Sequence, residues 1–342
     1  MPYYFNLPVI TSLTDNQQAA LDETESIALS GAPGTGKSVV CLWRHIRNYA
    51  TDTKESLLLT YTKTLEHYLR ESARSQNEEA AENVNRTYWW TSHKEIRKEF
   101  DEIIIDEGQD VWIDKYEIIK NYSSSISYGA DPYQSVYLSE EQLEKLIAWL
   151  KETFSDNEEY EMQKNFRNSK EILEFTQSVF PKILIPADTL HSAVETGLKP
   201  IMKITDWDEE LELEKMISII NEYASDTHNI GILVPSQKDV LKYFDLINNE
   251  LDGELECSKF ESEMGDFEGL SGIHITTFKS AKGIEFDTVI IPNFDRFDWL
   301  IKNTTTISEK DYYVAFTRAK TNLFLICKKN PQKGSFLTYE IE

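Results

Sequence analysis

The 342-residue sequence is poor in the features that mark several classes of protein. It has three cysteines (Cys41, Cys257 and Cys327), no CxxC spacing and no clustered histidines, which argues against a disulfide scaffold and a zinc site. No apolar run approaches the roughly 18 residues of a membrane-spanning helix, and the start MPYYFNLPVI lacks the basic residues of a signal peptide. We therefore expect a cytoplasmic protein with no membrane partner.

Basic residues are also scarce, with 35 Lys+Arg against 59 Asp+Glu and a net charge of −24. Charge alone argues against nucleic acid, because binding to phosphates normally leaves a basic footprint. The hydrophobic fraction of 40%, with 7 Trp, 17 Tyr and 16 Phe, is typical of a folded chain and excludes the disordered class. At about 150 residues per domain, the length predicts roughly two domains.

Short apolar runs alternate with amphipathic segments along the chain. Segments such as 62–74, 139–154 and 169–180 place apolar residues at three- and four-residue spacing, which predicts helices. The alternation predicts an α/β fold with parallel sheets. The predicted strands cover residues 26–31, 56–62, 102–107, 125–131, 229–236, 272–278, 287–293 and 322–329.

Two polar stretches interrupt this pattern. Residues 150–162 become acidic between two series of strands and helices, so we place a boundary between domains 1–152 and 153–342, with a cleft between them. Residues 251–272 are acidic and contain glycine, which predicts a long surface loop.

The strongest motif fits GxxxxGK[ST] and lies between a predicted strand and a predicted helix. Backbone N–H groups of such a loop cradle phosphates, Lys37 would reach the β- and γ-phosphates, and Ser38 would ligate Mg²⁺. The motif therefore predicts ATP and Mg²⁺ as cofactors. Its residues are Gly31, Ala32, Pro33, Gly34, Thr35, Gly36, Lys37 and Ser38.

Paired carboxylates follow the apolar strand Ile103-Ile-Ile. Asp106 at the end of this strand can hold Mg²⁺, and Glu107 beside it can accept a proton from an attacking water. Together with the phosphate-binding loop, the pair predicts an ATP hydrolase.

The GxxxxGKS loop and the paired carboxylates belong to a longer series of motifs in a fixed order. Apart from the loop, the motifs lie at residues 13–21 (LTDNQQAAL), 57–65 (LLLTYTKTL), 91–93 (TSH), 106–110 (DEGQD), 129–137 (GADPYQSVY), 165–167 (NFR), 276–289 (TTFKSAKGIEFDTV) and 313–320 (YVAFTRAK). In this order they resemble the Q motif and motifs Ia, Ib, II, III, IV, V and VI of the superfamily 1 helicases of the UvrD/Rep type. The resemblance implies two RecA-like P-loop NTPase domains, 1A and 2A, with parallel sheets and an ATP cleft between them.

The resemblance also implies roles for single residues. Gln17 would read the adenine edge, Phe166 would stack on adenine and Glu285 would bind the ribose. Catalysis would use Lys37, Asp106, Glu107, Gln134 as the sensor of the γ-phosphate, Arg167 at the γ-phosphate and Arg318 as a second arginine finger. The residues implied at the nucleic acid are Thr60, Tyr61, Thr62, Thr91, His93, Tyr137, Thr277 and Lys279.

The chain departs from the family pattern in three places. Ser139 stands where the family has a tryptophan that stacks on a base, and Lys279 replaces a histidine. Only about 28 residues separate Thr62 from Thr91, and about 108 separate Arg167 from Thr276, so the accessory domains 1B and 2B have no room. We therefore expect a compact motor whose ability to separate strands alone is in doubt.

Two functions remain open. The first is an ATP-dependent helicase or translocase core on single-stranded DNA, with 3′→5′ polarity implied by the resemblance and RNA as an alternative track. The second, favoured by the net charge, is an ATP-driven switch or motor subunit that regulates a protein partner such as a nuclease or accessory subunit. An inactive scaffold is disfavoured, because it has no use for the complete set of catalytic residues.

Overall fold

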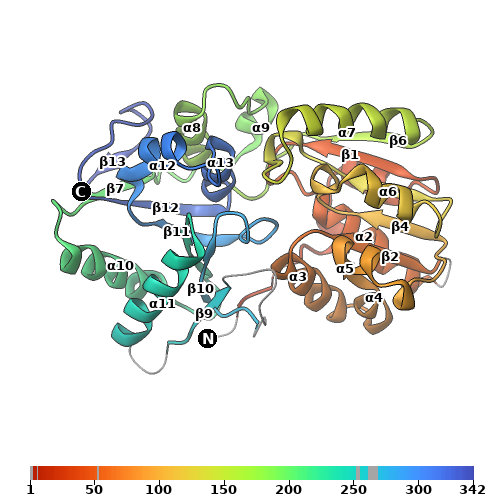
Figure 1. Cartoon of the computed structure of the whole chain (residues 1–342), viewed down its shortest axis with the longest axis horizontal. Helices are drawn as coiled ribbons and strands as arrows, with labels where there is room; N and C mark the ends of the chain where they lie inside the picture. The colour runs from red at the N-terminus through yellow and green to blue at the C-terminus, as the bar shows by residue number, and fades with distance from the viewer. Residues whose placement is uncertain (1–2, 6, 52–53, 252–254, 261–268) are drawn as a thin grey trace. The chain divides into compact units, whose positions relative to one another are not determined.

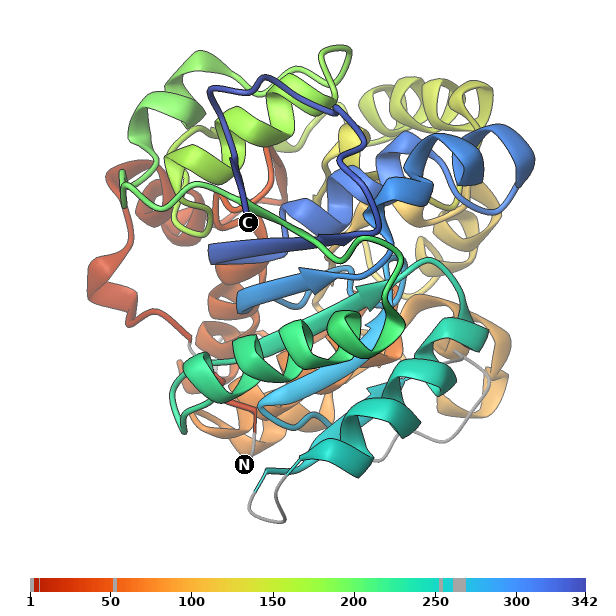
Figure 2. The same cartoon turned by 90° about the vertical axis from the view of Figure 1, so that its left-hand side faces the viewer.

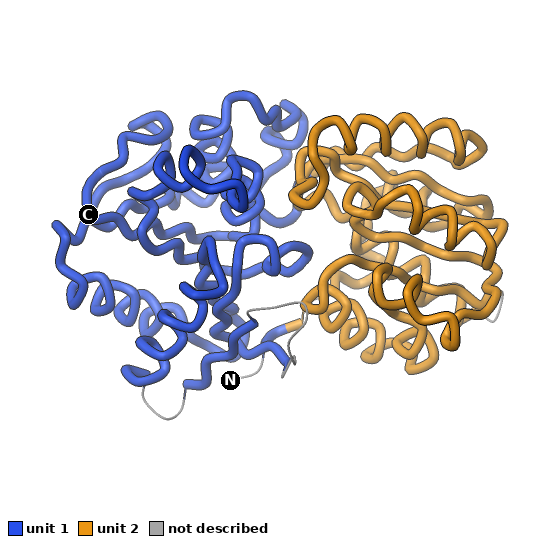
Figure 3. Tube along the Cα trace, in the orientation of Figure 1, with its two compact units in different colours: residues 1–4, 165–342 blue, residues 5–164 orange. Residues whose placement is uncertain are grey.

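The computed structural model describes residues 3–5, 7–51, 54–251, 255–260 and 269–342. The chain divides into two compact units (Figure 3). Unit 2 comprises residues 5–164, and unit 1 comprises residues 1–4 together with 165–342. The chain therefore passes from one unit to the other twice, once after Tyr4 and once after Lys164.

Unit 2 is an α/β unit around one parallel sheet (Figure 1). Its strands are β1 (Ile27–Gly31), β2 (Ser56–Thr60), β3 (Val84–Arg86), β4 (Glu102–Ile105), β5 (Ile126–Gly129) and β6 (Glu158–Met162). Its helices are α1 (Asp15–Asp22), α2 (Lys37–Ala50), α3 (Lys63–Arg74), α4 (Glu78–Glu82), α5 (Thr87–Ser92), α6 (Ile113–Ile119) and α7 (Glu140–Thr153). Short 3-10 helices cover Ile10–Ser12, Lys94–Ile96, Gly108–Asp110 and Pro132–Gln134.

The strand order β3-β2-β4-β5-β1-β6 brings three functional loops to one edge of this sheet. β5 pairs with β1 on one side and with β4 on the other, all in parallel. The loops that follow these three strands therefore leave adjacent positions at the carboxyl edge, where α/β sheets bind ligands. They carry the GxxxxGKS motif, Asp106 with Glu107, and the 129–137 motif.

Alternate residues of the strands point to opposite faces and form two cores. Leu58 and Ile104 pack with residues of α1 to α4, whereas Leu57, Leu59 and Ile105 pack with residues of α5 to α7. Both faces of the sheet are thus covered, which explains why its central strands are apolar throughout.

A buried ion pair fixes α2 within this sandwich. Arg44 donates from Nε to Glu102 at 2.6 Å and from its terminal nitrogens to the carbonyls of Glu23 at 2.7 Å and Glu25 at 2.6 Å. Arg44 is only 1% exposed. Inside the protein, Glu102 balances its charge, and backbone carbonyls accept its remaining hydrogen bonds. The end of α1 and the start of β4 are thereby held to the helix that begins at Lys37.

Unit 1 is a second α/β unit with a seven-stranded parallel sheet. Its strands are β7 (Ile201–Ile204), β8 (Ile230–Val234), β9 (Cys257–Phe260), β10 (Ile273–Thr277), β11 (Phe286–Ile291), β12 (Ala319–Cys327) and β13 (Glu340–Ile341). Its helices are α8 (Lys170–Val179), α9 (Ala187–Ser192), α10 (Glu209–Tyr223), α11 (Gln237–Glu250), α12 (Phe297–Asn303) and α13 (Glu309–Phe316), with a 3-10 helix at Phe294–Arg296. The order is β13-β7-β12-β11-β8-β10-β9.

Helices cover both faces of this sheet as well (Figures 1 and 2). Met216 and Ile220 of α10 and Val240 and Ile247 of α11 pack on one face, in a core that includes residues of β8, β10, β11 and β12. Helices α8 and α13 contact β12 on the other, where Phe175 and Phe316 stack at a centroid distance of 5.4 Å. All eight predicted strands form, and the predicted α/β class with two parallel sheets is confirmed.

The boundary between the units lies later than the sequence predicts. The predicted division between residues 152 and 153 falls at the end of α7, whereas the compact units separate between Lys164 and Asn165. The cause is β6, whose acidic segment Glu158–Met162 pairs in parallel with β1 and so belongs to unit 2. β6 is an edge strand, where charged side chains face solvent and also discourage pairing with other chains.

The predicted loop at 251–272 is partly wrong. Within it, Cys257–Phe260 forms β9, which pairs in parallel with β10. Residues 252–254 and 261–268 lie outside the described part of the chain.

The N-terminal segment packs on unit 1. The buried Tyr3 donates its hydroxyl to the backbone carbonyl of Glu285 and meets Phe286 edge-on at 6.1 Å. The backbone of Tyr4 exchanges two hydrogen bonds with the Asn229 side chain, both at 2.9 Å. Two residues at the start of the sequence thus belong to the unit built mainly from its second half.

Among the helices of the described residues, none has both the length and the apolar character needed to cross a bilayer.

Candidate nucleotide and nucleic-acid sites

The GxxxxGKS segment forms a tight loop between β1 and α2. Gly31, Gly34 and Gly36 have φ values of 141°, 73° and 88°, which L-residues with a side chain rarely adopt. A Cβ on Gly31 would lie 2.3 Å from the Met162 carbonyl oxygen of β6, so the strand pairing also demands glycine there. Lys37, the first residue of α2, donates to the carbonyls of Gly31 at 2.7 Å and Ala32 at 3.0 Å.

Gln17 is placed against this loop. Its Oε1 accepts from the backbone N–H of Thr14 at 3.0 Å, and its Nε2 donates to the Thr35 carbonyl at 3.1 Å. Gln17 is 4% exposed, and a Cβ on Gly36 would meet Gln17 Nε2 at 2.3 Å. The residue expected at the adenine therefore supports the phosphate-binding loop in this structure.

Asp106 follows β4 and lies beside Ser38 and Lys37. Burial, followed by the charge of Glu107, raises the pKa of Asp106 to about 7, while a hydrogen bond with the Ser38 side chain and the Lys37 charge oppose the rise. Its Oδ2 is buried and has no hydrogen-bond partner. Hard cations such as Mg²⁺ prefer oxygen ligands, and an orphaned carboxylate oxygen next to a hydroxyl is the donor set that such a cation uses. Ser38 and Asp106 thus fit the expected metal.

Glu107 lies in a strained and well-supported turn. Its φ of 58° is unusual for a residue with a side chain, and such strain often marks functional sites. Gln109 donates from Nε2 to Glu107 Oε2 at 2.5 Å and accepts at Oε1 from the backbone N–H of Asp131 at 2.9 Å. The carboxylate expected to act as general base is therefore held by a completely buried amide.

Asp131 joins the loops after β1 and β5. Its Oδ2 accepts from Gln134 Nε2 at 2.6 Å and lies 3.9 Å from Lys37 Nζ. Gln109 and Asp131 were not assigned roles from the sequence, although both lie inside quoted motifs, DEGQD and GADPYQSVY. Gln109 and Asp131 connect Lys37, Glu107 and Gln134 because β1, β5 and β4 are neighbours in the sheet, which the sequence alone does not show.

Unit 1 brings its own group of expected nucleotide contacts together. Arg167 donates from Nε to Glu285 Oε2 at 2.7 Å, and Lys320 lies 3.0 Å from Glu285 Oε1. Phe166, next to Arg167, is 48% exposed. Asn168 donates to the carbonyls of Thr317 and Ala319, so the 165–167 and 313–320 motifs form one structural piece.

Arg318 is placed differently from the other arginine. It is 1% exposed and donates from Nε to the Val314 carbonyl at 3.2 Å and from Nη1 to the Ile284 carbonyl at 3.4 Å. In the described arrangement its guanidinium supports the backbone between α13 and β11. A role at a phosphate would require the side chain to turn out.

The residues expected at a nucleic acid separate into buried and accessible ones. Thr60, Thr62 and Thr91 are at most 2% exposed; Thr62 caps α3, and Thr91 donates to the Thr87 carbonyl at 2.7 Å. Thr62 and Thr91 therefore organise the backbone in this arrangement, whereas the buried Thr60 Oγ1 has no hydrogen-bond partner among the described residues. None of the three presents its hydroxyl at the surface. In unit 1, Thr277 accepts from the Ser280 N–H, and Lys279 lies 3.9 Å from Asp311.

Aromatic side chains follow the ends of β2, β3, β4 and β5. Tyr61 and Tyr137 pack ring on ring at 4.4 Å, and Trp89 stacks on His93 at 3.7 Å. The strongly exposed members of this group are Tyr88, Trp89, Trp112 and Tyr133. Ser139, at the position of the family's stacking tryptophan, caps α7 in a capping box.

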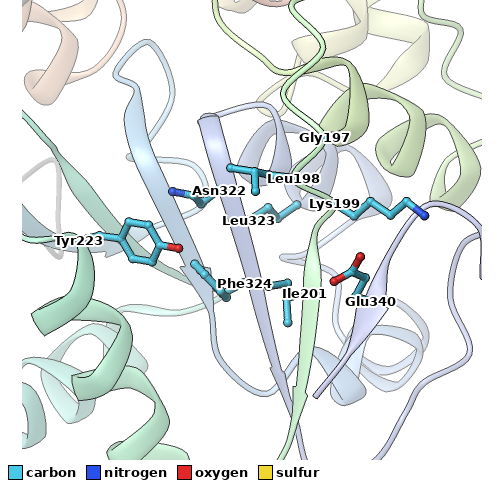
Figure 4. A pocket seen from close by; sticks show the side chains of 9 residues that line it. All are labelled: Gly197, Leu198, Lys199, Ile201, Tyr223, Asn322, Leu323, Phe324 and Glu340. Atoms are coloured by element: carbon cyan, nitrogen blue, oxygen red, sulfur yellow. The ribbon is translucent and has the colours of Figure 1, made fainter.

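Two pockets lie apart from these residues. One of about 90 Å³ in unit 1 lies beside β7 and β12 and is lined by residues that include Tyr223, Phe324 and Glu340 (Figure 4). Another of about 550 Å³ in unit 2 is lined by Glu55, Glu79, Glu82 and Asp101 among others. Neither is lined by a residue that the sequence assigned to a site.

Comparison with known families gives two matches. The Schlafen group 3 DNA/RNA helicase domain matches residues 25–263, and the UvrD-like helicase C-terminal domain matches residues 255–330. The chain is 25% identical over 263 residues, or 70% of its length, to a protein of Acanthamoeba polyphaga mimivirus. That protein is named as an ATP-dependent DNA helicase, R568, by inference. The chain spans 36% of that protein's length.

Solved structures with a similar arrangement include two viral helicases. The arterivirus nonstructural protein 10 helicase matches at a TM-score of 0.48 with 12% identity, covering 92% of this chain and 62% of that one. The PRRSV helicase matches at 0.46 with 12% identity, covering 93% and 55%. Because the Schlafen group 3 profile covers well over half of the sequence, the chain belongs to the family of that helicase domain and, as the ordered motifs predict, to the superfamily 1 helicases.

Proposed function

We propose that the chain is an ATP-dependent helicase or translocase core that hydrolyses ATP to ADP and phosphate while it moves on single-stranded DNA. The observation that carries the proposal is the orphaned, buried Oδ2 of Asp106 beside Ser38 and Lys37, at the edge where β1, β5 and β4 end. A buried carboxylate without a partner is costly, and a site that retains one has a use for it.

Each group at this edge has a chemical task in the proposal. Lys37 exchanges its contacts with the Gly31 and Ala32 carbonyls for phosphate oxygens, and the loop N–H groups bind the remaining phosphate charge. Ser38 and Asp106 hold Mg²⁺, which would neutralise charge on the β- and γ-phosphates. Glu107, oriented by Gln109, accepts the proton of the attacking water.

Arg167 and Arg318 are proposed to act as arginine fingers from unit 1. An arginine finger accelerates nucleotide hydrolysis by about 10³ to 10⁵ in related enzymes. Because the two arginines and the phosphate-binding loop belong to different units, hydrolysis would respond to the motion of one unit against the other. Such coupling is what a translocating motor requires.

Binding of a single strand is supported by the aromatic group of unit 2. Base stacking on exposed rings is worth about 1–3 kcal/mol per base and needs no sequence preference. Lys115 lies 5.4 Å from the ring centre of Tyr88, and Arg86 lies 5.9 Å from that of Trp89, so cations accompany the rings. Tyr61, Tyr137 and His93, with Lys279 of unit 1, are the proposed contacts.

The test is the steady-state ATPase rate of the purified chain with and without single-stranded DNA, single-stranded RNA and duplex DNA. Lys37→Ala serves as the blank. We expect a Lys37-dependent rate that rises at least tenfold with single-stranded DNA and falls as salt is added, because phosphate contacts release counterions. Displacement of strands from substrates with one single-stranded end then decides the proposed 3′→5′ polarity.

A second candidate, a switch that regulates a protein partner, is favoured by the net charge of −24. Such a charge repels nucleic acid at long range and suits a basic protein surface. A Lys37-dependent rate that ignores every nucleic acid would select this candidate. No hydrolysis under any condition, with Lys37→Ala indistinguishable from the wild type, would reject both.

A further inference from the structure

A compact cluster of charges in unit 1 joins three segments of the chain. Glu285 lies just before β11, Lys320 is the second residue of β12, and Arg167 belongs to the turn before α8. The Glu285 carboxylate is engaged at both oxygens, by Arg167 Nε at 2.7 Å and by Lys320 Nζ at 3.0 Å. Lys320 also lies 3.6 Å from Asp287.

The backbone around this cluster is tied at several points, and β11 and β12 shift register between Phe286 and Thr288, where Asp287 and Lys320 lie. Phe286 pairs with Ala319 in the register of β11 and β12, and Asn168 donates to the Ala319 carbonyl at 2.6 Å. The hydroxyl of Tyr3 holds the Glu285 carbonyl. We therefore expect the cluster to rearrange by movement of side chains. The cation that is least restrained by its position in the chain should be the one that leaves Glu285.

The two cations stabilise the ionised form of the Glu285 carboxylate. Burial alone would raise the pKa of Glu285, but Lys320 and then Arg167 lower it to about 2. The carboxylate is thus ionised at any physiological pH, and it neutralises the guanidinium that the proposed function places at the γ-phosphate. An arginine paired in this way has a fixed orientation and less charge to offer to a transition state.

The two proposed tasks of the cluster compete. A ribose hydroxyl that donates to Glu285 competes with the two cations for the same pair of carboxylate oxygens. Lys320 is held by a second carboxylate, Asp287, and it is anchored on a strand; Arg167 lies in a turn. The partner displaced by the hydroxyl is therefore Arg167.

We propose that Glu285 is a latch that holds Arg167 until the ribose of a bound nucleotide displaces it, and that Lys320 is the positioning residue that retains Glu285 when Arg167 leaves. The inference rests on the proposed function, because it takes the nucleotide to be the ligand of this cluster. It adds a consequence: a nucleotide without ribose hydroxyls binds but leaves Arg167 latched.

The first experiment needs no hydrolysis. Phenylglyoxal modifies accessible arginines, and mass spectrometry of the Arg167 peptide measures the rate. In the wild type we expect slow modification, which adenosine raises at least threefold and 2′,3′-dideoxyadenosine leaves unchanged. Glu285→Ala should react at the raised rate without a nucleoside. Arg296, exposed elsewhere in unit 1, is the internal control.

The role of Lys320 is tested in the same assay. In Lys320→Met, departure of Arg167 would leave the half-buried Glu285 carboxylate without a cation, so adenosine should no longer raise the modification rate of Arg167. Lys320→Arg should restore the response. Lys170→Met, which removes an exposed ion pair with Glu195 in the same unit, should respond like the wild type. An unchanged rate in Glu285→Ala, or equal rates with the two nucleosides, overturns the latch.

The second experiment separates the latch from the proposed function. At saturation, kcat of the wild type for ATP should exceed kcat for 2′,3′-dideoxyATP at least tenfold, and Glu285→Ala should bring the ratio close to one. A carboxylate that only binds ribose would change KM and leave this kcat ratio near one in the wild type. If ATP is hydrolysed with equal kcat for both nucleotides, the latch fails and the proposed function stands. If nothing is hydrolysed but Arg167 responds as stated, the latch stands and the proposed function fails.

Discussion

At the scale of single residues, the site combines strain with an unsatisfied charge. Glu107 has a left-handed backbone, and Asp106 keeps an oxygen buried without a partner. Both features cost stability, on the order of 1–3 kcal/mol each. They persist because the surrounding sheet and the buried Gln109 hold the turn in place. In the proposed function, this loss of stability is offset by the use of Asp106 for a cation and of Glu107 for the attacking water.

Replacement of Asp106 should therefore stabilise the protein while it removes activity. We expect Asp106→Asn to raise Tm by several degrees in EDTA, because the amide carries no charge to bury, and to abolish stabilisation by Mg²⁺ with ATP. Thermal unfolding by calorimetry, in EDTA and in MgCl₂ with ATP, measures both effects.

Asp110→Asn is the matched control for this experiment. Asp110 is buried in the same turn, but its Oδ1 already accepts from Ser135 Oγ at 3.3 Å. This variant should gain no stability in EDTA. A lower Tm for Asp106→Asn than for Asp110→Asn in EDTA would contradict the prediction. It would mean that the buried charge of Asp106 does not destabilise the protein.

At the scale of elements, the pairing of β1 with β6 connects the phosphate-binding loop to the edge of the sheet. The pair runs in register from Ile27 and Glu158 to Gly31 and Met162. The last position of the pair is thus the first glycine of the loop. A disturbance at this position acts on strand and loop together.

Gly31→Ala should damage both folding and nucleotide binding. Its Cβ would lie 2.3 Å from the Met162 carbonyl and 2.8 Å from Thr35 Oγ1, and φ is 141°. We expect a loss of about 2–4 kcal/mol in the free energy of unfolding and at least tenfold weaker ATP binding, since the loop must shift. Urea unfolding and equilibrium binding of ATP check the two effects.

Gly197→Ala separates backbone strain from the clash. Gly197 has a φ of 75°, and a Cβ there would have no atom within 4 Å. This variant should lose only about 1 kcal/mol and bind ATP normally. Equal losses in the two variants would show that the approach of Met162 is not what requires glycine in the loop.

The elements that the sequence failed to predict are short or polar. β6 reads as an acidic linker because as an edge strand it exposes Glu158, Glu159 and Glu161. β3 and β13 have three and two residues, too few for any periodic pattern. The central strands were predictable because burial on both faces makes them continuously apolar.

The same distinction holds for the site. Motif residues such as Lys37 and Asp106 are recognisable because phosphate and cation chemistry fixes their type and spacing. The partners Gln109 and Lys320 depend on which strands become neighbours, and spacing along the chain does not carry that information. The burial of Arg318 and Thr91 was likewise not predictable, because a motif specifies residue types and leaves the orientation of side chains open.

At the scale of the whole molecule, each unit buries one uncharged histidine. His45 in unit 2 is hydrogen-bonded to Ser56 and to the Ala80 carbonyl, and His274 in unit 1 to Ser258. Burial lowers the pKa of His45 to about 4 and that of His274 to about 3. Both units are therefore sensitive to mild acid.

The direction of this effect follows from linkage. Unfolded histidine takes up a proton near pH 6.5, whereas the folded residues remain neutral down to about pH 4 and pH 3. The unfolded state thus binds more protons in this window, so stability is complete above pH 6.5 and falls as the pH drops. We expect a loss of about 2 kcal/mol per histidine at pH 5, measured as the free energy of unfolding in urea.

His45→Gln, which can keep a donor for the Ala80 carbonyl, should remove about half of this loss. A wild type whose stability is the same at pH 7.5 and pH 5, or a variant with an unchanged pH dependence, would contradict the assignment of the effect to buried neutral histidine.

The N-terminal contacts with unit 1 set an order of events during synthesis. Tyr3 is separated from its partner Glu285 by 282 positions, so it leaves the ribosome long before the surface that binds it exists. At typical elongation rates of about 5–20 residues per second, the delay is on the order of ten seconds to a minute. Unit 2 is completely translated within this interval and can fold first, before the strands that bury Tyr3 have been made.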